Sequence, residues 1–218
     1  MMAKSGPPSK VASGGSERSA NTRRSLIDAA IETLKENGFS GASARAIAER
    51  AGLNQGLVFY HFGSVSNLLL AALDAVSEDR MIRFNAAIEN VSSPNDLMDV
   101  AAQIYREDLD TGHVTVLVEM IAGASSTPGL GAEVATRIVP WFAFTKDAID
   151  KTFGDSPFAS LLPADDVAYT IVALFLGLEM LTHLDGDRER VLTIFGRAQQ
   201  LVTMLGAFNA FAPPKETS

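Results

Sequence analysis

The sequence predicts an all-α protein with a small N-terminal head and a larger helical body. Apolar residues recur at spacings of three and four along most of the chain, which is the period of amphipathic helices. A glycine turn between two short helical segments, within Ser43–Phe62, predicts a helix-turn-helix in the head. No two segments alternate apolar and polar residues in the way that paired strands do.

The composition sets limits on the class of protein. The chain has 218 residues, 47% of them hydrophobic, which is enough for one domain or for a small and a larger one. Because it has no cysteine, disulfides and cysteine-ligated metal sites are excluded. The start of the chain lacks a signal-peptide core, and the longest apolar run, Val167–Leu178, is shorter than the ~20 residues that span a bilayer. We expect a cytoplasmic protein with no membrane partner and no cofactor.

The net charge of −8 hides a difference between the two ends of the chain. Residues 1–62 carry a net charge of +3, whereas residues 63–218 carry −11. A basic head on an acidic body would orient in the field of a polyanion such as DNA.

The N-terminal segment, residues 1–20, is rich in Ser, Gly, Pro and Ala and predicts a disordered tail. The alternative is a basic arm whose Arg18, Arg23 and Arg24 contact DNA phosphates or the minor groove. The first helix of the head is predicted at Thr22–Asn37, where apolar residues fall at helical spacing.

The two helices of the helix-turn-helix are predicted at Ser43–Arg50 and Asn54–His61. Gly52 between them suits the left-handed conformation that glycine adopts at low cost. Asn54 is expected to be an N-cap, whose side-chain oxygen accepts a hydrogen bond from the next helix. The second helix of such a motif fits the DNA major groove, although a corner in any helical protein has the same spacing.

The remaining helices are expected at residues 64–88, 94–109, 113–123, 129–153, 163–184 and 187–211. The segment 113–123 is β-branched, but it has no second strand to pair with, so we predict a buried helix. Ser93, Pro94 and Asp96 predict a capping box at the start of the second of these helices. We place the tail at 1–20, the head at 21–67 and the body at 68–212.

The penultimate helix is apolar on almost every side, so it must be covered on every side. The body can cover one side, and a second copy of the chain can cover the other. The last helix supplies a matching apolar stripe. We therefore expect a homodimer whose interface is a four-helix bundle formed by the last two helices of each chain.

The head resembles the tetracycline-repressor (TetR) family of bacterial transcription regulators. The matching residues are Ala29-Ala30, Gly38-Phe39, Ser43, Ile47-Ala48, Ala51-Gly52, Gly56, Tyr60-His61-Phe62 and Leu68-Leu69. The resemblance is specific over about Arg24–Leu73 and rests on length and helix pattern beyond it. It implies dimerisation through the last two helices, binding to a palindromic operator, and a pocket in the body for a small-molecule effector.

The resemblance also implies a set of DNA contacts. Ser43 would bond a phosphate, and Arg45 would reach a phosphate or a guanine edge. The expected DNA-binding residues are Ser43, Arg45, Asn54, Gln55, Gly56, Tyr60 and His61. Two positions depart from the family pattern, because Phe59 replaces a tyrosine and Val65 a lysine that contact phosphate in many relatives. We expect a shallow dependence of DNA affinity on salt.

Polar residues inside apolar helices of the body are candidates for effector binding. Glu119 and Glu179 are the most informative, because a carboxylate in an apolar helix is costly unless it is paired or faces a wet cavity. Pairing with a nearby arginine is the alternative. The candidate set is Tyr105, His113, Glu119, Met120, Trp141, Phe175, Glu179 and His183, which suits a small apolar or cationic effector.

The sequence gives less support to metal binding, to catalysis and to an architectural role. Glu179 and His183 lie four residues apart and could share a metal, but two ligands do not make a site, and no metal is expected. The chain has no P-loop, no G-x-S-x-G and no G-x-G-x-x-G, which argues against an enzyme. An architectural DNA-binding protein without an effector remains an alternative. The preferred prediction is a ligand-responsive regulator, most simply a repressor.

Overall fold

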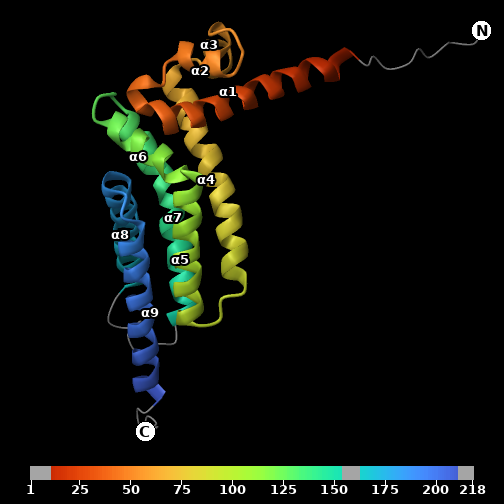
Figure 1. Cartoon of the computed structure of the whole chain (residues 1–218). Coiled ribbons are helices and arrows are strands. Elements are labelled where there is room, and N and C mark those ends of the chain that lie inside the picture. The colour runs from red at the N-terminus through yellow and green to blue at the C-terminus, as the bar shows by residue number, and fades with distance from the viewer. Residues whose placement is uncertain (1–10, 154–162, 211–218) are drawn as a thin grey trace, which may run out of the picture. The chain divides into compact units, whose positions relative to one another are not determined.

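The computed structural model describes residues 11–153 and 163–210, with side chains for 15–153 and 163–204 (Figure 1). Every regular element in these ranges is a helix, which confirms the all-α prediction. The helices are α1 (Val11–Gly41), α2 (Ala44–Arg50), α3 (Gly56–Phe62), α4 (Val65–Glu89), α5 (Pro94–Thr111), α6 (His113–Ala124), α7 (Leu130–Phe153), α8 (Ala164–Asp185) and α9 (Arg188–Ala210).

The chain divides into two compact units, Met1–Ala75 and Val76–Ser218, which we call the head and the body. The division falls inside α4, whereas the sequence placed the boundary at 67/68. It falls later because Leu68, Leu69 and Leu73, in the first turns of α4, are buried in the head.

Large side chains with no solvent exposure, contributed by four helices, form the core of the head: Leu26, Leu34, Ile47, Val58 and Leu68. The helices α2 and α3 have seven residues each, too few to be stable alone. Packing against α1 and α4 through this core therefore holds them in place.

The start of α1 differs from the prediction. The helix begins at Val11 and not at Thr22, so residues 11–20 are helical and the expectation of a disordered tail is wrong for them. No proline lies between Pro8 and Thr22, so the helix nucleated by the buried stripe can continue back through this segment. Residues 1–10 of the expected tail lie outside the described residues. At its other end the helix is interrupted at Gly38, as the sequence predicts, with φ 68°.

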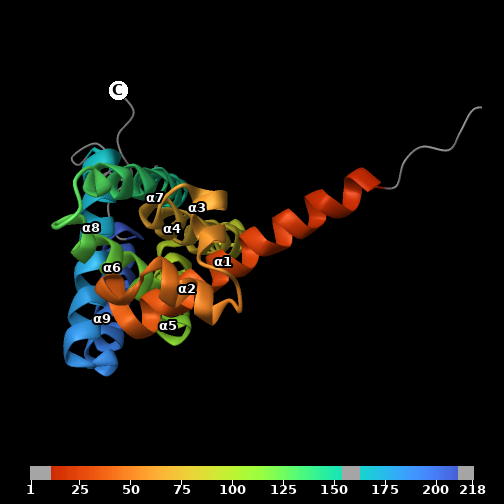
Figure 2. The same cartoon turned by 90° about the horizontal axis from the view of Figure 1, so that it is seen from above.

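The helices of the body follow the predicted order closely. A capping box begins α5: Ser93 Oγ accepts from the Asp96 N–H at 3.2 Å, and the Asp96 carboxylate accepts from the Ser93 N–H at 2.9 Å. The β-branched segment is helical, forming α6. In Figures 1 and 2, α8 packs along α7 and α9 runs beside α5. Polar contacts across the last pair include Gln199 Nε2 to Asp99 Oδ1 at 2.9 Å.

An apolar surface covers α8 and α9, which lie side by side at one edge of the body in Figure 2. Large apolar side chains stay exposed on both helices: Tyr169, Ile171, Leu174, Met180, Leu181, Leu184, Ile194, Leu201 and Met204. A monomer rarely leaves so many uncovered in one region. We call these residues the α8–α9 surface.

By length and composition α8 could cross a membrane, as could α3 and α4 taken as a pair bent by 67°. Core helices of soluble proteins pass the same test. In α8 the carboxyl group of Glu179 is buried against the body, so the side facing its neighbours is not uniformly apolar.

Candidate nucleic-acid interface and effector site

The turn between α2 and α3 is fixed by caps on both sides. Ser43 is the N-cap of α2, and its Oγ accepts a hydrogen bond from the Ala46 N–H at 3.2 Å. Gly52 has φ 65°, the left-handed conformation expected for it. The helix α3 begins at Gly56, two residues later than predicted. The side chain of Asn54 nevertheless reaches it, because Asn54 Oδ1 accepts from the Gly56 N–H at 2.8 Å.

The residues predicted to contact DNA lie mainly on the surface of this motif. Ser43, Arg45, Asn54, Gln55, Gly56 and Tyr60 are exposed, and His61 is half-buried. Tyr60 is 80% exposed although it is a large aromatic residue. His61 packs edge-on against its ring, with ring centroids 4.9 Å apart. An exposed aromatic ring beside polar residues at a helix-turn-helix is suited to contacts with bases and phosphates.

Basic residues of the head are partly engaged in internal contacts. The Arg23 guanidinium lies 5.0 Å from the centre of the Phe62 ring, and Arg50 pairs with Glu36. The arginines with exposed side chains that remain near the motif are Arg24 and Arg45. The shallow salt dependence stays a prediction.

In the body, the structure brings three of the candidate effector residues together. Tyr105 of α5 is fully buried, and its hydroxyl lies 2.5 Å from Thr182 Oγ1 of α8. Its ring packs edge-on against Phe175, with centroids 5.9 Å apart. Glu179 lies between Phe175 and Thr182 in the sequence of α8 and is 1% exposed. These residues, with Arg80 and Asp108, form what we call the buried acid cluster.

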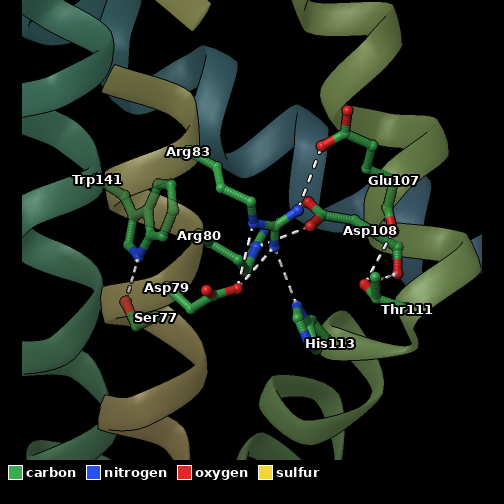
Figure 3. Close-up of polar contacts among 9 residues, drawn as sticks. All are labelled: Ser77, Asp79, Arg80, Arg83, Glu107, Asp108, Thr111, His113 and Trp141. Atoms are coloured by element: carbon green, nitrogen blue, oxygen red, sulfur yellow. Dashed lines mark hydrogen bonds and ion pairs between the residues drawn. The ribbon is translucent and has the colours of Figure 1, made fainter. Parts of the chain in front are cut away.

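A buried ion pair lies beside these residues (Figure 3). The Arg80 guanidinium of α4 donates from Nε to Asp108 Oδ1 of α5 at 2.8 Å, and from Nη2 to Oδ2. Both residues are buried, with exposures of 7% and 0%. The planar guanidinium also lies 4.8 Å from the centre of the Trp141 ring and 5.5 Å from that of Phe84. The two charges therefore neutralise each other in an aromatic setting.

Glu179 has no such partner. Neither carboxyl oxygen of Glu179 has a hydrogen-bond partner among the residues that the structure describes. Burial raises the pKa of Glu179 well above its usual value, Arg80 opposes this, and the nearby Asp108 carboxylate adds to it. Burial likewise raises the pKa of Asp108, against the effect of Arg80. Since two carboxylates only accept, Glu179 and Asp108 can bond each other only when one of them carries a proton.

Two further candidates lie at the edge of this cluster (Figure 3). Trp141 is half-buried and donates from Nε1 to Ser77 Oγ at 3.0 Å. His113 Nδ1 lies 3.3 Å from Arg83 Nη2, and Arg83 also pairs with Glu107 at 3.2 Å. These contacts connect α4 to α5, α6 and α7 within the body.

The other candidates are not brought to the cluster. Met120 is fully buried in α6, where its neighbours give it a packing role. Glu119 is half-buried, whereas His183 is exposed. The arrangement gives no support to a metal shared by Glu179 and His183, and no group of three potential metal ligands occurs within the described ranges.

Arg80 and Asp108 were missed by the sequence reasoning, although a signal for Arg80 exists. It lies in the charged stretch Glu78–Arg83, which suggests an exposed face. However, Val76, Arg80 and Phe84 follow one another at intervals of four, so Arg80 shares the buried stripe of α4. Its partner, 28 residues away, could not be identified from spacing.

Comparison with known proteins gives relatives over parts of the chain. UidR, an HTH-type transcriptional regulator of Escherichia coli, is 28% identical over 116 residues, which cover 53% of this chain and 58% of UidR. The match thus spans less than two thirds of UidR. CymR, a regulator of Pseudomonas putida, is 26% identical over 80% of this chain and 85% of its own. The repressor AcnR of Corynebacterium glutamicum is 32% identical over 34% of this chain and 40% of its own.

Solved structures show the same fold over most of the chain. A TetR-family regulator from Cytophaga hutchinsonii superposes with a TM-score of 0.71 at 19% identity, covering 85% of this chain and 95% of its own. A Saccharomonospora viridis protein in complex with choline superposes with a TM-score of 0.65 at 18% identity, covering 83% and 94%.

The helical head and its exposed motif define a helix-turn-helix protein with a separate helical body. The family model for bacterial regulatory proteins of the tetR family matches residues 26–72, from α1 into α4. This match, the curated relatives and the shared fold together support a TetR-family transcriptional regulator, as the sequence resemblance implied.

Proposed function

We propose that the protein is a cytoplasmic, ligand-responsive transcription regulator that represses by binding operator DNA as a dimer. One observation carries the proposal: the surface of α2 and α3 exposes polar residues around a Tyr60 that is 80% exposed, within the region that matches the family. TetR-family proteins are DNA-binding regulators and not enzymes, and AcnR is a repressor by name.

The DNA-contacting surface in this proposal consists of the predicted residues of α2 and α3. Ser43 and Arg45 contact phosphate or a guanine edge, and Gln55 and Tyr60 contact bases from the start and end of α3. The heads of a two-fold dimer would occupy successive major grooves about one helical turn apart.

The dimer in this proposal forms through the α8–α9 surface. The exposed Leu174 and Leu181 of α8 and Leu201 of α9 are large apolar residues that a second copy would cover. A two-fold pairing presents the same two helices from each chain and forms a four-helix bundle.

The effector in this proposal binds in the body and lowers operator affinity. Glu179 supports an effector, since a buried carboxyl without a hydrogen-bond partner is costly for an architectural protein to retain. A protein of the same fold, from Saccharomonospora viridis, has been solved in complex with choline, which supports a small-molecule ligand. Because α4 contributes to both units, it is the covalent path by which the body can influence the head.

The test is a gel-shift or fluorescence-anisotropy titration of the full chain against the DNA upstream of its own gene. Sequence-specific binding that a small molecule reverses is the expected result. Specific binding that no ligand affects would leave the architectural alternative. No specific binding would refute the proposal.

A further inference from the structure

We propose that the effector is an organic cation with N–H donors, a protonated amine, whose nitrogen bonds Glu179 in exchange for the proton of that carboxyl. The inference rests on the proposed function and specifies its ligand. It starts from the charge balance of the buried acid cluster, which holds two carboxyls, Asp108 and Glu179, and one guanidinium, Arg80.

The Arg80 guanidinium forms its hydrogen bonds with Asp108 and not with Glu179. Arg80 donates from Nε and Nη2 to the two oxygens of Asp108, so this bidentate edge of the guanidinium is already used. The buried hydroxyl of Tyr105 in α5 is engaged with Thr182. Ionised Glu179 is therefore left with two acceptor oxygens and no donor among the described residues, whereas the protonated form can donate to Asp108. A ligand that supplies N–H donors and a positive charge satisfies both needs at once.

Other charged groups near the cluster are engaged elsewhere. Arg83 of α4 acts on Asp108 and is held by Asp79 and Glu107, with His113 of α6 beside it. From the start of α9, Arg188 pairs with the exposed Asp110. The charged groups that shift the pKa of Glu179 are Arg80 and Asp108. Its ionised form thus gives the cluster one net negative charge.

The aromatic residues beside Glu179 favour a cation over other ligands. Phe175 lies one helical turn before Glu179, and the ring of Tyr105 packs against both Phe175 and Phe195, with centroids 5.9 and 5.5 Å apart. Aromatic faces attract cations when water is excluded. An anionic ligand would meet two carboxyls, and a neutral ligand would leave Glu179 protonated and gain no ionic bond from it.

Proton exchange follows from burial. Without a cation, burial favours the protonated Glu179, because its ionised form is not compensated. The ammonium group binds the ionised form, so the carboxyl loses its O–H proton to solvent as the new N–H to oxygen bond forms. Below the pKa of Glu179, the affinity for the cation should therefore rise about tenfold for each pH unit.

The experiment uses isothermal titration of the full-length dimer with benzylammonium, phenethylammonium and tryptammonium, each between pH 5.5 and 8. Titrations in phosphate and in Tris report proton release, since the two buffers differ in ionisation enthalpy. Benzyl alcohol is the neutral counterpart of the first probe. We expect at least one amine to bind with release of close to one proton, and benzyl alcohol to bind without release.

The variant Glu179→Gln keeps the size of the side chain and removes its charge. It should bind the amine about 10- to 100-fold more weakly and without proton release. The control Glu133→Gln removes an exposed carboxyl of α7 and should behave like the wild type. Amine binding that is equal in Glu179→Gln, binding without proton release, or no binding of any of the three amines would overturn the inference.

Operator binding separates this inference from the proposed function. The control Glu133→Gln should bind the promoter DNA like the wild type when no amine is present. Retained operator binding with no response to amines refutes the cationic effector alone, whereas loss of operator binding in the wild type refutes the regulator.

Discussion

The head and the body hold their polar residues in opposite ways. In the head, the polar residues of interest lie at the surface, on helices of seven residues whose positions depend on caps and on a small apolar core. In the body, Arg80, Asp108 and Glu179 are enclosed. Surface groups can be replaced at little cost in stability, whereas enclosed charges depend on one another. The exposed residues of the head are therefore available to a binding partner, whereas the buried charged residues of the body need a neutralising group.

The largest effect should come from breaking the enclosed ion pair. Asp108→Ala leaves the Arg80 guanidinium buried without its carboxylate, which should lower the free energy of unfolding by about 3–5 kcal/mol. Asp110→Ala, two residues on, removes a partner of Arg188 in an exposed pair and should cost less than about 1 kcal/mol. Urea unfolding followed by circular dichroism measures both. Equal losses would show that the pair is not isolated from solvent.

The same contrast explains which features could be predicted from sequence. Ser43, Gly52 and Asn54 act on backbone groups within three residues, so local spacing was enough to assign them. Tyr105 and Thr182 are 77 residues apart, and their contact exists only because α5 and α8 pack together. Periodicity identified those helices but not their mutual register.

The extent of α1 was missed for a related reason. Residues 11–20 carry few apolar residues, so no hydrophobic period indicates a helix there. The structure nevertheless continues the helix through them. Glu179 was identified because an acid in an apolar helix is conspicuous, whereas its unpaired state required the positions of Arg80 and Asp108.

The next effect concerns the head alone. Tyr60→Ala should weaken operator binding by about 1–3 kcal/mol, or about 5- to 150-fold, because an exposed ring at the end of α3 is a base or phosphate contact. Its stability should change by less than about 0.5 kcal/mol, because the side chain is 80% exposed. Fluorescence anisotropy and thermal unfolding measure the two quantities. A loss of stability with unchanged affinity would place Tyr60 in the structure of the head and not in its interface.

A pH-dependent effect tests the enclosed carboxyl. The pKa of Glu179 is raised above its usual 4.5 by burial, so the unfolded state releases its proton first as pH rises. The stability of the wild type should therefore fall as pH rises from the pKa of this carboxyl in the unfolded chain to its higher pKa in the folded protein. Glu179→Gln has no ionisable group at this position and so does not lose stability in this way. The difference between its melting temperature and that of the wild type should therefore shift in favour of the variant as pH rises from 5 to 8. The control Glu133→Gln should show no such trend, and a constant difference for Glu179→Gln would show that the carboxyl is already ionised when folded.

The smallest effect is expected from removing a serine N-cap, and each unit contains one. Ser43 caps α2, and Ser93 caps α5 as part of a capping box. Either serine replaced by alanine should cost about 1 kcal/mol of stability, because an N–H at the start of a helix loses its acceptor. The hydroxyl of Ser43 accepts the cap bond, so its own proton stays available to donate to a phosphate oxygen.

Ser43→Ala should therefore also weaken DNA binding, by about 1 kcal/mol, while Ser93→Ala leaves it unchanged. The comparison is matched because both variants remove one hydroxyl and one cap. Anisotropy at two salt concentrations completes it. A hydroxyl donor releases no counterion, so the salt slope should stay that of the wild type even as the affinity of Ser43→Ala falls. A changed slope, or equal affinity losses for the two variants, would mean that Ser43 acts through the fold of the head rather than through a phosphate.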